Sequence, residues 1–432
     1  MHGKVVRRVI AGIDMQQKIP ERKENSIICV RGKNVSGMDA AVQLPREVLT
    51  QGVGVIGETG SGKTYCIKRM VEDLRSNIGT DYSMIVIQAK NDFENYMRDE
   101  DYKLEQGVNS AGSIRWNIFR DILKDGYEDH IVELNTREFV AHLFEDKKDQ
   151  KEQFFVDGAR ELLYCIIISY IRAAEGSLQA REKLSNKGLR DFFLQYTSEN
   201  YKELLVNCGE PGVLKMILGE QTDNLQALGV WGELVTTVLY SMTDIFAEEG
   251  DFSIREFVSQ KQGRTLFINY DPAYKDSQIK LFGAVVKLVL KEALAQNARG
   301  GNTILVCDEL AAMGKTDIAE AVNLGRAKGL ITILGIQSIA QLYSIYGEYD
   351  GQKLLAGLCT KLYFRPNDSL TRQYLMDDFG KVIAEYMFLS PGGTCSERRE
   401  GYAIEDEDVI KMKVGDCYVK SVGGEMFKFH VC

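Results

Sequence analysis

The sequence predicts an α/β protein with a mostly parallel sheet, into which an all-α domain is inserted. Three observations support this fold class. Short apolar segments alternate with segments of helical periodicity in two separate stretches of the chain. This alternation stops between about residues 139 and 250, where helical spacing alone continues. The 432 residues include 44% hydrophobic residues and only 6 prolines, which is typical of a large folded core.

Apolar segments of four or five residues predict the strands. In chain order they are Val53–Ile56, Met84–Ile87, Thr265–Ile268, Thr303–Cys307, Ile331–Leu334 and Thr360–Phe364. Apolar residues at helical spacing follow the first strand, between Tyr65 and Arg75, and the third, between about Ser277 and Asn297. Strands that alternate with helices favour a parallel sheet covered by helices on both faces.

The middle of the chain is predicted to be helical. The expected helices are Phe154–Ala173, Lys187–Tyr196, Tyr201–Asn207 and Glu233–Phe246. We therefore expect three parts. They are a basic N-terminal segment of residues 1–34, a discontinuous α/β domain of residues 35–138 and 251–432, and an all-α insertion of residues 139–250.

Charge and composition exclude several classes of protein. The net charge of −9 does not indicate a protein that coats DNA with a basic surface. Residues 1–33 nevertheless carry eight Lys or Arg against three Asp or Glu; either an ordinary solvated segment or contact with phosphates or an anionic membrane surface explains them. Nine cysteines without a CxxC pair indicate reduced thiols. With no membrane-spanning run and no leader pattern, we expect a cytoplasmic protein.

A glycine-rich segment follows the first predicted strand. Gly57, Gly62, Lys63 and Thr64 fit the pattern GxxxxGK[ST], with a strand before it and a helix after it. Glycines let successive backbone N–H groups point at phosphate oxygens, and the helix N-terminus favours an anion. This context favours nucleotide binding over a plain glycine-rich turn. The predicted nucleotide-binding residues are Gly57, Glu58, Thr59, Gly60, Ser61, Gly62, Lys63, Thr64 and Tyr65.

Two acids end the fourth predicted strand. Asp308 and Glu309 directly follow the apolar residues Ile304–Val306 and Cys307, so they are expected beside the phosphate loop. Asp308 and the Thr64 hydroxyl are suited to hold Mg²⁺, and Glu309 is suited to polarise the water that attacks a γ-phosphate. Acids that cap the next helix are the alternative, but the phosphate loop favours the catalytic interpretation. The expected ligands are ATP and Mg²⁺.

Two further residues are catalytic candidates. Gln337 would end the strand next to that of Asp308, where its amide can sense the γ-phosphate. Arg326 precedes that strand, at the opposite edge from the phosphate loop, from which it could reach the nucleotide of a neighbouring subunit. A helix-capping glutamine and a surface arginine are the alternatives. The catalytic candidates are thus Glu309, Lys63, Arg326 and Gln337.

Three other polar or aromatic residues are expected to have structural roles and no direct contact with nucleic acid. Trp116 is expected in a core or a domain interface rather than as a platform for base stacking. Lys361 and Arg365 flank an aromatic strand, where a solvated strand edge is favoured over a contact with nucleic acid.

The segments around these residues resemble the TraG/TraD-type type IV secretion coupling proteins of the HerA/FtsK superfamily. The resemblance covers about residues 35–432. It rests on Asp308–Lys315, Asn323–Gly329, Leu334–Leu342 and Tyr346–Gly347, and extends to Arg115–Phe119, Asn367–Thr371 and Phe379–Gly380.

The resemblance implies a RecA-like P-loop ATPase that forms a homo-hexameric ring around DNA. It implies an ATP-driven DNA translocase, with single-stranded DNA in a central channel and a relaxase or other secretion components as partners in conjugation. Lys63 and Thr64 match the family's phosphate loop, Asp308 and Glu309 its acidic pair, Gln337 its sensor glutamine and Arg326 its trans-acting arginine. Family members usually carry two N-terminal transmembrane helices, which this sequence lacks, so peripheral association with the inner membrane through another protein is an expectation.

Two other functions remain open. A soluble HerA-like ring ATPase that works with a nuclease in repair or defence would share every catalytic residue. A nucleotide-gated adaptor that recruits substrates, with weak hydrolysis, would use the helical insertion for docking. Stimulation of ATP turnover by DNA would argue against the adaptor.

Overall fold

The structure is a computed structural model. It describes residues 6–13, 15–16, 19, 25–89, 91–107, 111–144, 149–174, 184–195, 225–270, 275–295, 300–390 and 393–432. The chain divides into two compact units. Unit 1 comprises Met1–Gln88, Asp92–Met97 and Gly300–Cys432, and unit 2 comprises Ala89–Asn91 and Arg98–Arg299.

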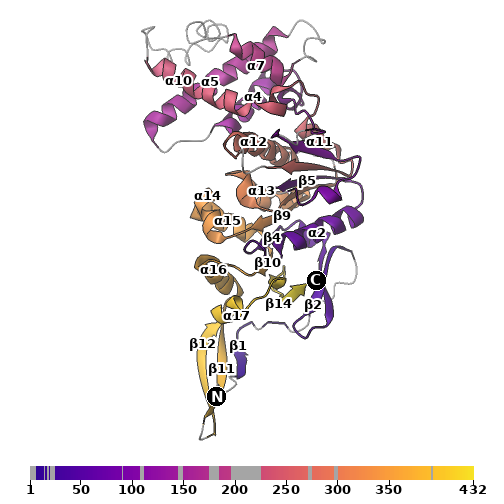
Figure 1. The fold of residues 1–432 in the computed structure, drawn as a ribbon, viewed down its shortest axis with the longest axis vertical. Helices are drawn as coiled ribbons and strands as arrows, with labels where there is room; N and C mark the ends of the chain where they lie inside the picture. Colours follow the sequence, from indigo (N-terminus) through magenta and orange to yellow (C-terminus); the bar gives the residue numbers. More distant parts are fainter. Residues whose placement is uncertain are drawn as a thin grey trace. The chain divides into compact units, whose positions relative to one another are not determined.

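A long sheet runs through unit 1 in the strand order β3-β2-β14-β13-β10-β4-β9-β8-β5 (Figure 1). Its strands are β2 (Ser26–Asn34), β3 (Asp39–Pro45), β4 (Val53–Ile56), β5 (Tyr82–Gln88), β8 (Asn302–Cys307), β9 (Leu330–Ile336), β10 (Thr360–Phe364), β13 (Asp416–Lys420) and β14 (Met426–Val431). From β10 to β5 neighbouring strands are parallel, as predicted. From β10 to β3 they are antiparallel, which was not predicted.

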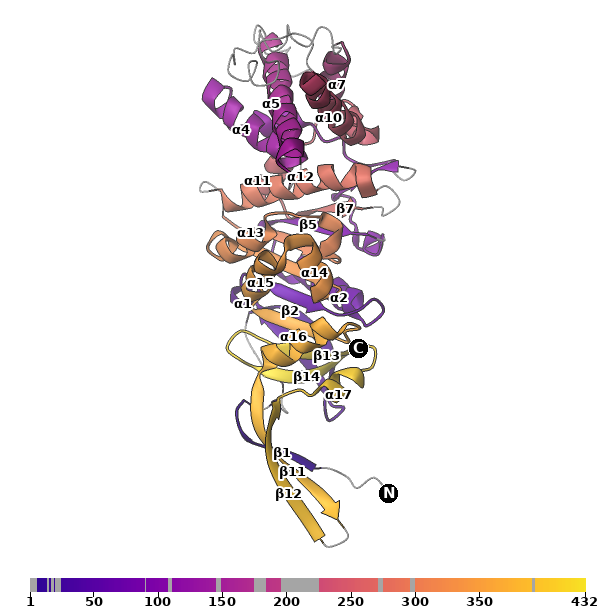
Figure 2. The ribbon, with the colours of Figure 1, turned by 90° about the vertical axis from the view of Figure 1, so that its left-hand side faces the viewer.

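Helices cover both faces of this sheet, which confirms the expected layering. Figures 1 and 2 show α2 on one face and α14, α15 and α16 on the other. The helical elements of unit 1 are α1 (Arg46–Leu49), α2 (Lys63–Asn77), η1 (Glu94–Tyr96), η5 (Leu310–Met313), α13 (Ile318–Gly325), η6 (Arg326–Lys328), α14 (Ile339–Tyr346), α15 (Glu348–Gly357), α16 (Ser369–Phe379) and α17 (Asp406–Ile410). Residues Ile67, Met70, Val71 and Leu74 of α2 are fully buried, at the spacing of one helix face.

A second, smaller sheet in unit 1 has the order β1-β11-β12 (Figure 2). Strand β1 (Val6–Ala11) pairs antiparallel with β11 (Lys381–Ser390), which pairs antiparallel with β12 (Gly393–Tyr402). Strands β1 and β2 both come from the basic segment 1–34, so its described residues take part in both sheets of unit 1.

Unit 2 contains the predicted helical region. Its elements are β6 (Tyr102–Glu105), α3 (Ile118–Ile122), α4 (Asp129–Leu143), α5 (Gln150–Ala173), α7 (Asn186–Leu194), α10 (Leu225–Ser241), η3 (Asp244–Ala247), α11 (Ile254–Gln260), β7 (Arg264–Asn269) and α12 (Lys275–Leu294). Helix α5 packs against α4 and α10, and β6 is parallel to β7.

The predicted helices of this region are largely confirmed. Helix α5 ends at the predicted Ala173, and α7 lies within one or two residues of its prediction. The prediction of one helix over Glu233–Phe246 is wrong at its end, because α10 stops at Ser241 and a separate 3₁₀ turn follows. The predicted helix Tyr201–Asn207 lies outside the described residues. The domain boundaries at 138 and 250 stay predictions.

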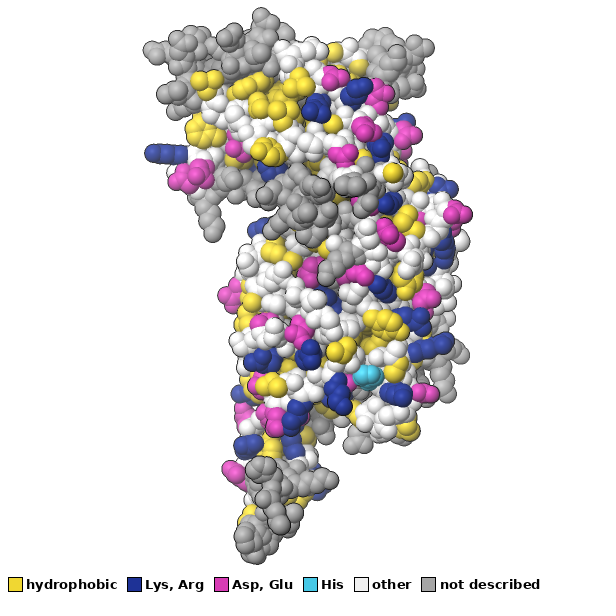
Figure 3. Space-filling model, in the orientation of Figure 1, with side chains coloured by type: hydrophobic (Ala, Val, Ile, Leu, Met, Phe, Trp, Pro, Cys, Tyr) yellow, Lys and Arg dark blue, Asp and Glu magenta, His cyan; other side chains and the backbone are white. Residues whose placement is uncertain are grey.

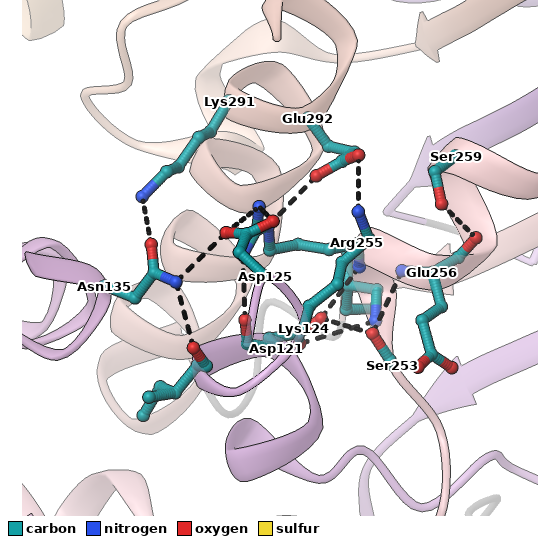
Figure 4. Close-up of polar contacts among 12 residues, drawn as sticks. Asp121, Lys124, Asp125, Asn135, Ser253, Arg255, Glu256, Ser259, Lys291 and Glu292 are labelled. Carbon is teal, nitrogen blue, oxygen red and sulfur yellow. Dashed lines mark hydrogen bonds and ion pairs between the residues drawn. The ribbon is translucent and has the colours of Figure 1, made fainter. Parts of the chain in front are cut away.

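Polar side chains of α3, α4, α11, α12 and the turn after α3 contact one another in unit 2 (Figure 4). Arg255 is only 4% exposed. Its Nε pairs with Glu292 at 3.0 Å, and its Nη atoms bond the Asp121 carbonyl at 2.9 Å and Asp125 at 3.0 Å. Glu292 also pairs with Lys124 at 2.8 Å. Burial raises the pKa of Asp121, although hydrogen bonds and the Arg255 charge oppose this shift.

Trp116 belongs to the same core, as predicted. Its ring is fully buried, and its Nε1 donates a hydrogen bond to Asp121 at 2.5 Å. A buried indole is no platform for bases.

One face of the molecule is mixed in charge. On the face drawn in Figure 3, Lys and Arg side chains are interspersed with Asp and Glu side chains. Among the residues that the structure describes, no helix combines the length and the apolar composition needed to cross a membrane.

Candidate nucleotide-binding site

The phosphate loop connects β4 to α2 in unit 1. Gly57 N donates to the Ile336 carbonyl at 3.0 Å, which ties the start of the loop to the end of β9. A Cβ on Gly57 would lie 2.6 Å from the Phe364 Cβ of β10, so this position requires glycine. Gly60 and Gly62 have φ of +78° and +110°, which other residues rarely adopt. The loop ends where α2 begins, at Lys63, and the N-terminus of a helix favours a phosphate.

Lys63 reaches the second acid of the predicted pair. Its Nζ lies 3.3 Å from the Glu309 carboxylate, and its side chain is only 7% exposed. Burial raises the pKa of Glu309, and the positive charge of Lys63 opposes that shift. The loop lysine and the candidate base are therefore neighbours, although 246 positions separate them in the sequence.

Thr64 and Asp308 also meet, as the metal prediction requires. The Thr64 hydroxyl donates to Asp308 Oδ2 at 3.0 Å. The other carboxylate oxygen, Oδ1, is buried and has no hydrogen-bond partner in the described part of the chain. Burial raises the pKa of Asp308, because a low-dielectric site disfavours an isolated carboxylate. A hydroxyl beside an unsatisfied carboxylate oxygen fits Mg²⁺, which prefers oxygen ligands.

Gln337 lies at the same edge of the sheet. Its Nε2 donates to the Thr59 hydroxyl of the loop at 3.0 Å. The parallel register pairs Ile56 with Ile336, so the strands that precede the loop and Gln337 end together. A surface pocket between η5 and α14 is lined by both Glu309 and Gln337, which leaves the candidate base open to solvent.

Arg326 is not brought to this edge. It lies in η6, just before β9 begins at Leu330, whereas the loop follows the other end of the neighbouring β4. Its side chain is exposed. The position agrees with the predicted one; no contact in the described part of the chain tests the predicted role.

Contacts to the loop from distant parts of the chain were not predicted. Gly415 N donates to the Ser61 carbonyl at 2.9 Å. The half-exposed Tyr65 donates through its hydroxyl to the Cys432 carbonyl at 2.9 Å. Arg365 forms an ion pair with Glu58. No local pattern signals these contacts, because each joins residues more than 300 positions apart.

The structure contradicts the prediction that Lys361 lies at a solvated strand edge. Its side chain is buried and pairs with Asp378 of α16 at 3.2 Å. It is therefore neither at a solvated strand edge nor available to nucleic acid, because α16 covers that face of β10.

Comparison with solved structures shows the same fold. The bacterial conjugative coupling protein TrwBdeltaN70, in its unbound form, has a TM-score of 0.72 at 19% identity, with 95% of this chain and 89% of that chain covered. Plasmid coupling protein TrwB with the ATP analogue ADPNP has a TM-score of 0.74 at 18% identity, with 98% and 94% covered. VirB4 of Thermoanaerobacter pseudethanolicus has a TM-score of 0.55 at 14% identity, with 96% and 98% covered. The fold is thus the RecA-like α/β fold that was expected.

Comparison of the sequence with protein families gives the more specific result. No protein of curated function matches the chain. Residues 38–411 match the family described as the type IV secretion-system coupling protein DNA-binding domain. This match covers most of the 432 residues and includes the phosphate loop, Asp308, Glu309 and Gln337. The chain therefore belongs to the family of type IV secretion-system coupling proteins.

Proposed function

We propose that the protein is an ATP-driven DNA translocase of the coupling-protein type. The proposal rests on the convergence of Lys63, Thr64, Asp308, Glu309 and Gln337 at one edge of the sheet. The solved relative TrwB has been captured with ADPNP and with ADP and Mg²⁺, which supports ATP as the nucleotide.

The residues of the loop would bind the phosphates and prepare hydrolysis. Backbone N–H groups of the loop and the Lys63 ammonium would hold the β- and γ-phosphates. Lys63 now pairs with Glu309 at 3.3 Å. Transfer of this lysine to the phosphates would leave the Glu309 carboxylate free to orient water and accept its proton.

The residues around Asp308 fit a magnesium ion. Thr64 and Asp308 would hold it, and the remaining ligands would come from phosphate and water, since the described residues contain no cluster of three acids, histidines or cysteines able to bind a metal alone. When bound, Mg²⁺ neutralises charge on the phosphate oxygens. Gln337, through its bond to Thr59, would respond to whether the γ-phosphate is present.

The exposed position of Arg326 supports an oligomeric enzyme. Arg326 is exposed at the opposite edge of its own sheet and would act on the nucleotide of the next subunit, which requires an oligomer. We propose a homo-hexameric ring with single-stranded DNA in its channel. A relaxase or other secretion components, and a peripheral position at the cytoplasmic side of the inner membrane through another protein, remain expectations from the family.

The first experiment is steady-state ATP hydrolysis with and without single- and double-stranded DNA, with Lys63→Ala as the blank. An assembling DNA motor should be stimulated strongly by DNA, and its specific activity should rise with protein concentration. Good basal hydrolysis that DNA does not change would refute translocation and favour the recruitment adaptor.

A second experiment tests Arg326 in trans. Arg326→Ala should abolish hydrolysis but retain nucleotide binding. Mixed with Lys63→Ala protein, it should regain part of the activity, because mixed rings contain intact interfaces. If the two variants co-assemble and the mixture stays inactive, Arg326 does not act across the interface.

A further inference from the structure

The phosphate loop of this protein carries an acid of its own. Glu58 lies directly after Gly57, inside the loop that is proposed to surround a polyphosphate. A triphosphate brings several negative charges to this loop, and an uncompensated carboxylate there would repel it. Nucleotide binding therefore depends on what balances the Glu58 charge.

Arg365 is the residue that contacts this acid. It directly follows β10, the neighbour of the loop strand β4 in the sheet. Its Nε lies 2.5 Å from Glu58 Oε1, and its carbonyl accepts a hydrogen bond from Glu58 N at 3.0 Å. Both the backbone and the side chain of Glu58 are thus attached to one residue.

The surroundings make this contact specific. The two strands approach closely here, since a Cβ on Gly57 would meet the Phe364 Cβ at 2.6 Å. The Glu58 side chain is 19% exposed, so water screens its charge only in part, whereas the Arg365 side chain is 38% exposed. A guanidinium keeps its charge at every working pH, so the acid is balanced permanently.

We propose that Arg365 is a positioning residue for the nucleotide. It neutralises the Glu58 carboxylate and holds it against the end of β10, so that the loop presents its N–H groups and Lys63 to the phosphates without a competing negative charge. This inference rests on the proposed nucleotide binding and adds a residue that the phosphate-loop pattern does not contain.

The proposal makes a prediction about two substitutions in combination. Arg365→Gln leaves Glu58 charged and unpaired, and should weaken binding of ADPNP by about tenfold at low salt, as expected for one uncompensated charge near the phosphates. Glu58→Gln removes the charge and should tighten binding about twofold. The double variant should recover to within about threefold of the wild type, because no acid then remains to be balanced.

The test is calorimetric titration of the whole chain with ADPNP and Mg²⁺ at about 50 and 500 mM salt. High salt should shrink the defect of Arg365→Gln, which a purely structural role would not produce. Arg372→Gln is the matched control, since Arg372 pairs with Asp406 at 2.9 Å and does not contact the loop. Its affinity should equal that of the wild type. Thermal melting of each variant shows whether the fold is kept.

Three outcomes would overturn the inference. Arg365→Gln could bind as tightly as the wild type. The double variant could remain as weak as Arg365→Gln, which would mean that the guanidinium contacts the nucleotide itself. The defect could be the same at both salt concentrations. A wild-type chain that does not bind ADPNP at all would instead refute the proposed function, and this inference with it.

Discussion

Gly335 offers a direct test of how the sheet positions the candidate site residues. This residue lies in β9, two positions before Gln337, and its neighbour across the sheet is the end of β8. A Cβ at Gly335 would lie 1.9 Å from the Asp308 carbonyl oxygen, whereas ordinary contact begins at 3.4 Å. Gly335→Ala must therefore separate the ends of β8 and β9 by about 1.5 Å, because the obstacle is backbone and has no rotamer to adopt.

The displacement should affect hydrolysis far more than binding. Asp308 and Glu309 would move away from Gln337 and from the loop, and a shift of about 1 Å can reduce turnover about 100-fold. We expect kcat to fall by about that factor, the affinity for ADPNP to change less than about fivefold, and unfolding to be easier by about 1–3 kcal/mol. Steady-state hydrolysis, calorimetric titration and urea denaturation measure the three quantities.

Gly54→Ala is the matched control in the adjacent strand β4. Its Cβ would meet the Leu358 side chain at 3.2 Å, and a side chain can move. This variant should keep kcat within about threefold of the wild type. If Gly335→Ala also keeps kcat within threefold, the spacing of β8 and β9 does not set the geometry of the site, and the argument from the sheet edge fails.

Three further predictions concern stability. Arg255→Met should lower the free energy of unfolding by about 3–5 kcal/mol, because it removes the buried guanidinium that pairs with Glu292 and Asp125, so that Lys124 alone remains to balance Glu292. Lys187→Met, which removes an exposed ion pair at 3.9 Å, should cost less than about 1 kcal/mol in urea denaturation; equal losses would contradict this. His142 has its pKa lowered to about 3 by burial and by nearby lysines, so the unfolded chain binds more protons between that pH and 6.5, and stability should fall as pH drops through this window. Between pH 7 and pH 5 the free energy of unfolding of the wild type should fall by about 2 kcal/mol more than that of His142→Gln. Equal falls for the two proteins in urea denaturation would refute this prediction. Tyr346→Phe should cost about 1–3 kcal/mol, because its buried hydroxyl donates to the Gly314 carbonyl at 3.0 Å and lies 3.3 Å from the Thr316 hydroxyl; an unchanged melting temperature would argue against this.

The parallel half of the sheet and the core of the site were accessible from local sequence. Strands β4, β8 and β9 are short, wholly buried runs, which hydrophobic pattern identifies well. The end of such a strand also indicates where its next side chain lies, so Asp308 and Gln337 could be placed at one edge before their contacts were known.

The antiparallel half was missed for a physical reason. Strand β13 has only three apolar residues between Asp416 and Lys420, and Lys428 and His430 interrupt the apolar run of β14. One partner of β14 also comes from the other end of the chain, since β14 pairs with β2. The burial of Lys361 and the pairing of Arg365 with Glu58 are tertiary effects of the same kind, and no spacing within the sequence encodes them.

The antiparallel strands have a consequence for folding during synthesis. The Ser61 carbonyl of the loop is bonded to Gly415, and β1 and β2 pair with β11 and β14. At about 5–20 residues per second, a ribosome needs roughly 20–70 s to pass from the loop to residue 415. A chain released early would therefore carry the complete phosphate loop, Asp308, Glu309 and Arg326, but not the strands that brace them. Such a fragment should be a substrate for proteolysis rather than a defective member of the proposed ring, so that translation itself would screen which chains can enter that proposed assembly.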